Sequence, residues 1–174
     1  MFTDPVKNLK LLGLEETMIV ADLGAGTGYY SIPAAKIVKN GKVYAIEVQK
    51  DFLKTIINKA HDAKLENLEC IWGDVEKIGG TKIGDSIVDA AIVSNVFCLI
   101  EDKDKLLQEA KRILKNKGRV LIVEINEDSA LVAKSKSICI SKNNIRTLFE
   151  KEGFIHDKDI DAGHHHYGMI FIKQ

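Results

Sequence analysis

The sequence is poor in proline, cysteine and tryptophan, and it has no net charge of either sign. Its 174 residues include 2 prolines, 3 cysteines and 1 tryptophan, and 25 Lys and Arg balance 25 Asp and Glu. A balanced chain has no overall electrostatic attraction to nucleic acid or to an anionic membrane, so we expect neither as a partner. No apolar run reaches the roughly 18 residues of a membrane span, and the first ten residues lack the apolar core of a signal peptide.

The three cysteines, Cys70, Cys98 and Cys139, lie in apolar segments, and no two are spaced as C-x-x-C. This pattern indicates free thiols in a reducing compartment. With the absence of a signal peptide, it predicts a soluble, cytoplasmic protein. The length suits one domain with its own core, and we expect residues 1–174 to form that single domain.

Short apolar runs alternate with amphipathic segments along most of the chain. Apolar runs predict strands at residues 18–23, 42–47, 68–72, 87–95 and 119–125. Apolar residues at helical spacing, together with capping signals, predict helices at residues 4–13, 29–39, 52–60, 106–114 and 145–153. Two final runs, residues 154–160 and 167–173, leave no room for a helix between them and should pair antiparallel. The alternation predicts an α/β fold with a mostly parallel sheet covered on both faces.

Two segments are candidates for covering a substrate pocket. Residues 1–13 form an N-terminal helical segment, with Asp4 as its cap and Pro5 at its first position. Residues 126–140 have no clear period and are expected to form a loop. Segments of this kind carry substrate selection in many enzymes, so we expect both to lie over the acceptor side of the site.

In the sequence VADLGAGTG, residues 20–28, the end of an apolar run is followed by three glycines, Gly24, Gly26 and Gly28. Glycine allows the backbone to approach a ligand closely, and ligands of parallel sheets bind at the carboxyl ends of strands. A dinucleotide site has the spacing G-x-G-x-x-G, whereas the spacing here is G-x-G-x-G. This difference weakens the alternative of a nicotinamide-dependent oxidoreductase.

Three acidic residues at strand ends favour a cationic ligand. Asp22 precedes the glycines, Glu47 closes the second expected strand, and Asp74 follows the third. Asp22 would repel a pyrophosphate, since like charges about 4 Å apart cost roughly 4 kcal/mol at an effective dielectric constant of about 20. An adenosine with a cationic amino-acid tail suits all three acids, with Glu47 on the ribose hydroxyls and Asp74 on the adenine amino group. That molecule is S-adenosylmethionine.

The ordered motifs resemble those of class I S-adenosylmethionine-dependent methyltransferases. The similarity runs from about Met18 to the C-terminus, through VADLGAGTG, VYAIE, WGDVE, DAAIVSNVF and LLQEAKRILKNKGRVLIVEI. The branch that it resembles most contains the ubiquinone/menaquinone C-methyltransferases. The resemblance implies a three-layer, doubly wound, seven-stranded sheet in the order 3-2-1-4-5-7-6, with strand 7 antiparallel.

The sequence departs from the family pattern in two places. Asn116, Lys117 and Gly118 stand where relatives have proline-glycine-glycine, which is expected to alter a turn and not the chemistry. The fourth motif has Ser94-Asn95 and lacks the Pro-Pro of methyltransferases that act on amino groups of DNA bases or protein glutamine. This second departure argues against those acceptors.

The motifs and the resemblance give a candidate cofactor site. Thr27 and Tyr29 are assigned to the methionine end, Val48 and Val75 to the adenine, and Asn95 to the reacting methyl group. The expected site comprises Asp22, Gly24, Ala25, Gly26, Thr27, Gly28, Tyr29, Glu47, Val48, Gly73, Asp74, Val75 and Asn95.

Several of these assignments keep a structural alternative. Tyr29 is also an ordinary residue for a helix start, Asp74 for a turn or cap, and Asn95 for a turn. Glu124, near the end of a strand, either faces the acceptor pocket or makes a structural hydrogen bond.

The run His164–His166 suggests a metal site or a base. Adjacent residues on a strand point to opposite faces, so three in a row rarely converge on one ion, and we expect no metal. A histidine that acts as a base near the acceptor stays open. We expect in-line transfer of a methyl group to a small-molecule acceptor, by a monomer or a homodimer, with no catalytic residue assigned. A non-catalytic S-adenosylmethionine-binding module is the alternative.

Overall fold

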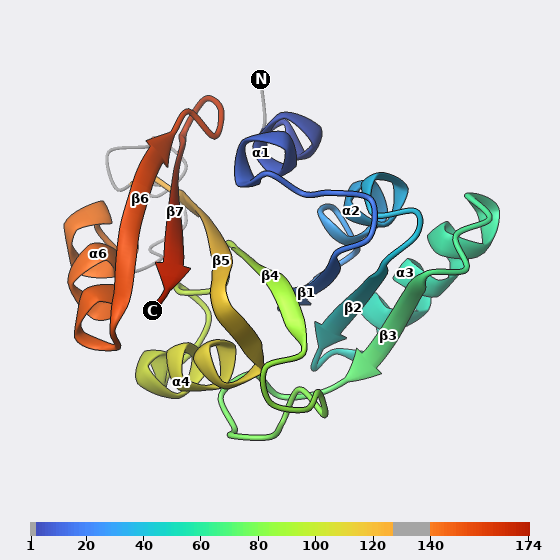
Figure 1. The fold of residues 1–174 in the computed structure, drawn as a ribbon. Helices are drawn as coiled ribbons and strands as arrows, with labels where there is room; N and C mark the ends of the chain where they lie inside the picture. The colour runs from blue at the N-terminus through green and yellow to red at the C-terminus, as the bar shows by residue number, and fades with distance from the viewer. Residues whose placement is uncertain (1–2, 127–139) are drawn as a thin grey trace.

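The structure, a computed structural model, describes residues 3–126 and 140–174. Its seven strands form one sheet in the order β3-β2-β1-β4-β5-β7-β6 (Figure 1). In chain order the elements are α1 (Pro5–Leu12), β1 (Ile19–Leu23), α2 (Ser31–Ile37), β2 (Lys42–Glu47), α3 (Lys50–Asp62), β3 (Leu68–Trp72), β4 (Val88–Ser94), α4 (Lys103–Ile113), β5 (Leu114–Ile125), α6 (Lys142–Lys151), β6 (Phe154–Ile160) and β7 (His166–Lys173).

The strand directions confirm the expected α/β fold. Strands β1 to β5 pair in parallel, and β7 runs antiparallel to both β5 and β6. The chain order reverses at β1, which lies between β2 and β4. The loop that follows β1 therefore lies at a topological switch point, where open α/β sheets bind their ligands.

Helices cover both faces of the sheet, with α1, α2 and α3 on one side and α4 and α6 on the other (Figure 1). On the α4 side, the rings of Phe149 and Phe171 stack with centroids 4.2 Å apart in the core. On the other side, Leu9 and Leu12 of α1 pack in a second core with Val20 of β1. Strands β1 and β4 are buried between the two cores, as their near-continuous apolar sequences predict.

The ends of α1 follow directly from its sequence. The Oδ1 atom of Asp4 accepts a hydrogen bond from the Lys7 amide at 3.0 Å, and Pro5 takes the first helical position. Gly13 ends the helix with φ of 80°, a conformation that glycine adopts without strain. The Lys7 ammonium lies 3.0 Å from Asp161 Oδ2, which joins α1 to the β6–β7 hairpin beside it (Figure 1).

Strand β5 differs from the expectation. It begins at Leu114, directly after α4, whereas the sequence pattern placed Leu114 in the helix and the strand start at Arg119. Leu114 pairs with Val88, and the register shifts before Arg119 pairs with Ala90. Lys117 has φ of 62°, so the predicted turn is present as an irregularity within the strand. The expected 126–140 loop lies outside the described residues, apart from its ends.

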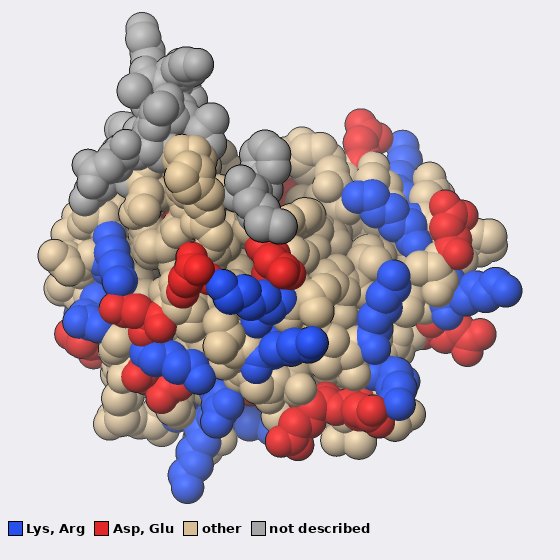
Figure 2. All heavy atoms as spheres, turned by 90° about the horizontal axis from the view of Figure 1, so that it is seen from above, with Lys and Arg blue, Asp and Glu red and all other residues tan. Residues whose placement is uncertain are grey.

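The face of the molecule seen from above carries side chains of both charges, interspersed (Figure 2). Exposed pairs such as Lys39–Glu16, at 2.8 Å, contribute about 0–1 kcal/mol each. None of the described helices has the length and hydrophobicity that crossing a bilayer requires.

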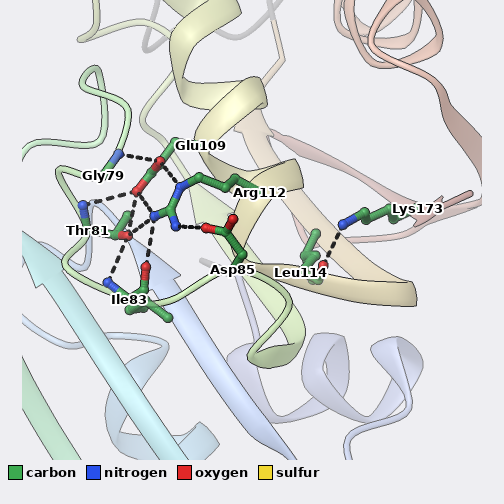
Figure 3. A network of polar contacts seen from close by, with 8 residues as sticks. All are labelled: Gly79, Thr81, Ile83, Asp85, Glu109, Arg112, Leu114 and Lys173. Carbon is green, nitrogen blue, oxygen red and sulfur yellow. Dashed lines mark hydrogen bonds and ion pairs between the residues drawn. The ribbon is translucent and has the colours of Figure 1, made fainter.

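A buried ion pair connects the loop between β3 and β4 to α4 (Figure 3). Glu109 is fully buried and accepts hydrogen bonds from the Gly79 amide at 2.8 Å and the Thr81 hydroxyl at 2.6 Å. Arg112 donates to Glu109 Oε1 at 2.7 Å and to Asp85 at 2.5 Å. Burial alone would raise the pKa of Glu109, but the bonds from Arg112, Thr81 and Gly79 outweigh it and lower the pKa to about 2.

Candidate functional site

A cavity of about 400 Å³ lies where the glycine loop meets the ends of β1 and β4. Its lining residues are Thr3, Asp22, Gly24, Ala25, Gly26, Thr27, Tyr29, Tyr30, Ser94, Asn95 and His166. The structure thus brings together Asp22, Gly24, Ala25, Gly26, Thr27, Tyr29 and Asn95 of the expected site. The expected residues that do not line this cavity are Gly28, Glu47, Val48, Gly73, Asp74 and Val75.

The three glycines have different surroundings, although all have positive φ: 76° at Gly24, 54° at Gly26 and 82° at Gly28. A Cβ on Gly24 would lie 2.6 Å from a Val96 methyl carbon, and one on Gly28 would lie 3.2 Å from Ile56 in α3. A Cβ on Gly26 would meet nothing within 4 Å. Gly26 therefore leaves its backbone open to the cavity, whereas Gly28 packs against a helix, which explains its absence from the lining.

Asp22 is a buried acid that the fold already holds. Its side chain, in a residue 2% exposed, accepts a hydrogen bond from the Ser31 hydroxyl at 2.5 Å. Burial raises the pKa of Asp22 to about 7, with the nearby Glu47 charge adding to the rise and the Ser31 bond opposing it. A cation in the cavity would stabilise the ionised form, so this carboxyl responds to ligand charge near neutral pH.

Glu47 connects the end of β2 to the glycine loop. Its Oε2 accepts a hydrogen bond from the Gly26 amide at 2.9 Å, and its Oε1 accepts from the amides of Val48 and Gln49, both at 2.9 Å. A carboxylate offers about four acceptor positions, and three are used here. One acceptor position is therefore left for a ribose hydroxyl in this conformation, and the expected grip on both hydroxyls stays a prediction.

The two valines expected on either side of an adenine lie in unlike environments. Val48 is 58% exposed, whereas Val75 is buried in the core. Gly73 faces the neighbouring loop, where a Cβ would lie 2.5 Å from the Gly80 carbonyl oxygen. Only Val48 therefore presents an exposed apolar surface, and the Trp72 indole, which donates to the Val48 carbonyl at 2.9 Å, lies next to it.

Asp74 shapes the turn after β3. Its Oδ1 accepts from the Glu76 amide at 3.0 Å, and its Oδ2 lies 3.0 Å from the Lys77 ammonium. Burial would raise the pKa of Asp74, but the bonds from Lys77 and from the Glu76 backbone lower it. The structure thus shows the turn role that the sequence left open for this residue.

Asn95 combines a strained backbone with an unsatisfied side chain. Its φ is 54°, and its Oδ1 is buried with no hydrogen-bond partner among the residues the structure describes. A buried acceptor without a donor is costly, so a donor in the cavity would stabilise this side chain. Glu124 fixes the turn that follows, because its Oε1 accepts from the amides of Val96 at 2.8 Å and Phe97 at 3.0 Å.

Glu124 therefore makes the structural hydrogen bonds that the sequence left as one of two options. It is fully buried, and burial raises its pKa to about 7 against the opposing effect of the two amides.

His164 and His165 lie at the turn between β6 and β7, and His166 begins β7. A second cavity, of about 590 Å³, has the lining residues Asp4, Lys7, Asn126, Asp161, Ala162, Gly163, His164, His165 and His166. Only His166 also lines the first cavity. Within residues 3–126 and 140–174, no group of three or more His, Cys, Asp or Glu is arranged to hold a metal ion.

The sequence did not assign Tyr30 or Ser94 to the first cavity, nor Ser31 to the carboxyl of Asp22. Thr3 belongs to the N-terminal segment expected over the acceptor side, and His166 to the histidine run that was left open as a base near the acceptor. Tyr30 and Ser94 directly adjoin expected residues, which is a signal that could have found them. Thr3 and His166 reach the cavity only through tertiary contacts of the chain ends, which no local pattern records.

Residues 14–161 match the family described as "Methyltransferase domain". A probable cobalt-precorrin-6B C(15)-methyltransferase (decarboxylating) from Methanosarcina mazei is 29% identical over 83% of each chain. The ubiquinone/menaquinone biosynthesis C-methyltransferase of Haemophilus ducreyi is 26% identical over 66% of this chain and 44% of its own length. The crystal structure of an S-adenosylmethionine-dependent methyltransferase from Aquifex aeolicus superposes with a TM-score of 0.87, at 27% identity, over 99% of this chain and 91% of that one.

The sheet order, the glycine loop and these relatives define a class I S-adenosylmethionine-dependent methyltransferase. The chain belongs to the methyltransferase domain family, whose match covers residues 14–161. The resemblance inferred from the sequence motifs is thereby confirmed.

Proposed function

We propose that this methyltransferase acts on a small-molecule acceptor, by in-line displacement, with the methionine end of its cofactor in the cavity of the glycine loop. The first cavity is the observation that supports this proposal. It combines the buried Asp22 carboxyl, the open backbone of Gly26 and the unpaired Oδ1 of Asn95 around about 400 Å³. A buried acid, an open backbone and an unpaired acceptor fit a ligand that carries an ammonium group.

Each residue is assigned a role consistent with its place. Asp22 attracts the ammonium, and Thr27 and Tyr29 line the methionine end. Glu47 accepts one ribose hydroxyl at its remaining position, and the exposed Val48 lies against the adenine. Asp74, Gly73 and Val75 act indirectly, by shaping the loop after β3 beside Glu47, whose carbonyl accepts from the Gly73 amide at 3.2 Å.

The cofactor, when bound, supplies a methyl group already activated by its positive sulfur. The chain contributes alignment of the acceptor with that methyl group. Orientation of this kind lowers a barrier by about 7–11 kcal/mol when the reacting atoms are held close and in line. Asn95 and His166, which line the same cavity as the glycine loop, are the side chains placed to orient the acceptor.

Two features support a small-molecule acceptor. The second cavity adjoins the first through His166, and its volume of about 590 Å³ suits a small ligand. The Methanosarcina mazei and Haemophilus ducreyi relatives have names that specify carbon methylation of small molecules. Cobalt-precorrin-6B and precursors of ubiquinone and menaquinone are therefore the first acceptors to test.

The proposal is tested by binding and then by turnover. S-Adenosylhomocysteine should bind in calorimetry and raise the melting temperature, because a ligand of the native state stabilises it by mass action. NAD should do neither, and the reverse result would support the nicotinamide alternative. Label from methyl-labelled S-adenosylmethionine should then appear in a small-molecule acceptor. Binding of S-adenosylhomocysteine without transfer to any acceptor would instead support a non-catalytic binding module.

A further inference from the structure

His166 stands at the junction of the two cavities. It begins β7 and pairs with Ile125 at the end of β5, and its amide donates to the Gly163 carbonyl at 3.1 Å. It is the only imidazole among the described residues that line the first cavity, and it also lines the second. A molecule that enters the second cavity would therefore meet the glycine-loop cavity at this side chain.

The contact of the His166 ring with the backbone favours one of its two neutral tautomers. Its Nδ1 lies 3.3 Å from the His164 carbonyl oxygen. A carbonyl oxygen only accepts hydrogen bonds, so this contact favours the tautomer with the proton on Nδ1. The neutral ring then has its lone pair on Nε2. Partial burial, together with the charge of His165, lowers the pKa of His166 against the opposing bond to His164, so the ring is neutral at pH 8.

The charged groups around the second cavity already have partners. Lys7 lies 3.0 Å from Asp161, and the other oxygen of Asp161 accepts from the Gly163 amide at 3.2 Å. Asp4 accepts from the Lys7 amide at 3.0 Å. In the first cavity, Asp22 accepts from Ser31 at 2.5 Å. His164 and His165 are exposed at the turn and do not line the first cavity.

We propose that His166 is the catalytic base of this methyltransferase and that the second cavity, between α1 and the β6–β7 hairpin, admits the acceptor. The inference rests on the function proposed above and adds the acceptor class, a molecule with a removable proton on oxygen, nitrogen or an activated carbon.

The step balances without a further reactant. The acceptor gives its proton to Nε2 of His166, and the electron pair that remains forms the bond to the methyl carbon. The bond between that carbon and sulfur breaks, and its electron pair stays on sulfur. The imidazolium then releases its proton to solvent.

The test compares His166→Gln with His61→Gln, which makes the same change at an exposed position on α3. With an acceptor that the wild type methylates, sought first among the molecules named under the proposed function, His166→Gln should lower kcat by about 100-fold or more, the usual contribution of a positioned base. His61→Gln should stay within twofold. Added imidazole should restore part of the activity of His166→Ala, a rescue that a purely structural role does not give.

Two readouts are independent of turnover. Binding of S-adenosylhomocysteine, followed through the single tryptophan, Trp72, should change less than threefold in His166→Gln. Long-range ¹H–¹⁵N spectra of the imidazoles, assigned by comparison with that variant, should show His166 as the Nδ1–H tautomer at pH 8. An Nε2–H tautomer, or a kcat of His166→Gln within threefold of the wild type, overturns the inference while the proposed function stands. A wild type that binds S-adenosylhomocysteine but methylates none of the small-molecule acceptors tested overturns both.

Discussion

The Ser31 hydroxyl donates a 2.5 Å hydrogen bond to the carboxyl of Asp22, which joins the first residue of α2 to β1 at the glycine loop. Asp22 is 2% exposed, and its pKa is raised to about 7 mainly by burial. The acid that the motif assigns to ligand binding is therefore also a buried, hydrogen-bonded side chain of the free fold, where burial disfavours its ionised form. Its ionisation is coupled both to folding and to the charge of whatever occupies the cavity.

The raised pKa values of Asp22 and Glu124, both about 7, predict a pH-dependent stability. Each acid is more easily protonated in the folded protein than in the unfolded chain. Its contribution to the stability of the fold is therefore fully present below the ordinary pKa near 4 and is lost as pH rises through about 7. For each group, the free energy of unfolding should fall by roughly 2–3 kcal/mol between pH 5 and pH 8.

Urea unfolding of Asp22→Asn and Glu124→Gln at both pH values measures this loss. Each variant should lose less stability than the wild type over the same interval. If both variants lost as much stability between pH 5 and pH 8 as the wild type does, the raised pKa values would be contradicted.

The contact between Ser31 and Asp22 also shows where sequence reasoning stops. The strand and helix periods predicted the elements and a mostly parallel sheet because each rests on local alternation of apolar residues, whereas the strand order was predicted only from the resemblance to the methyltransferase family. The eight residues between Asp22 and Ser31 carry no periodic signal, so the contact of Asp22 with Ser31 comes only from the tertiary path of the glycine loop. The same applies to Glu47. Its carboxylate accepts hydrogen bonds from three backbone amides, which its position at a strand end did not indicate.

A matched pair of glycines separates backbone strain from ligand contact. Gly26 and Gly79 have φ of 54° and 77°, and a Cβ on either would meet nothing within 4 Å. Gly26→Ala and Gly79→Ala should each destabilise the fold by about 1–2 kcal/mol, the usual penalty for a side chain in the left-handed region.

Only Gly26→Ala places its methyl group at the glycine-loop cavity. We expect it to weaken S-adenosylhomocysteine binding by at least tenfold in calorimetry, whereas Gly79→Ala should leave the affinity unchanged. Equal affinities in the two variants would show that the ligand does not approach the backbone at Gly26.

The Glu109–Arg112 pair should matter for stability and not for the site. Removing one partner of a buried pair leaves an uncompensated charge, so Arg112→Met should lower the free energy of unfolding by about 3 kcal/mol at pH 7. The double variant, Glu109→Gln with Arg112→Met, also removes the negative charge of Glu109 and should therefore lose less stability than Arg112→Met alone. Chemical denaturation measures both, and S-adenosylhomocysteine affinity should be unchanged because neither residue lines a described cavity near the glycine loop. A double variant less stable than the single one would show that the hydrogen bonds of Glu109 to Gly79 and Thr81 outweigh its charge.

The irregular start of β5 shows a second limit of sequence reasoning. Leu114 satisfies the helical spacing of the residues before it, yet it pairs with Val88 as the first residue of a strand. Local period cannot distinguish the last apolar position of a helix from the first of a strand when no turn separates them. The partner strand decides the boundary, and the partner is not visible in the local sequence.

The charge of Asp22 gives the sharpest test of the cofactor proposal. Asp22→Asn keeps the shape of the side chain and its contact with Ser31 but removes the negative charge that we assign to the cofactor ammonium. S-Adenosylmethionine should therefore bind more weakly to the variant, by about 10-fold or more, as expected for the loss of a bond between charged groups.

In the wild type, the ammonium lowers the pKa of Asp22 from about 7, so binding should release a proton and tighten as pH rises through about 7. Adenosine lacks the amino-acid tail, so its affinity should be nearly the same in both proteins and nearly independent of pH in this range. Calorimetry with both ligands at pH 6 and pH 8 checks these expectations, and equal losses for adenosine and S-adenosylmethionine would show that Asp22 only shapes the glycine loop.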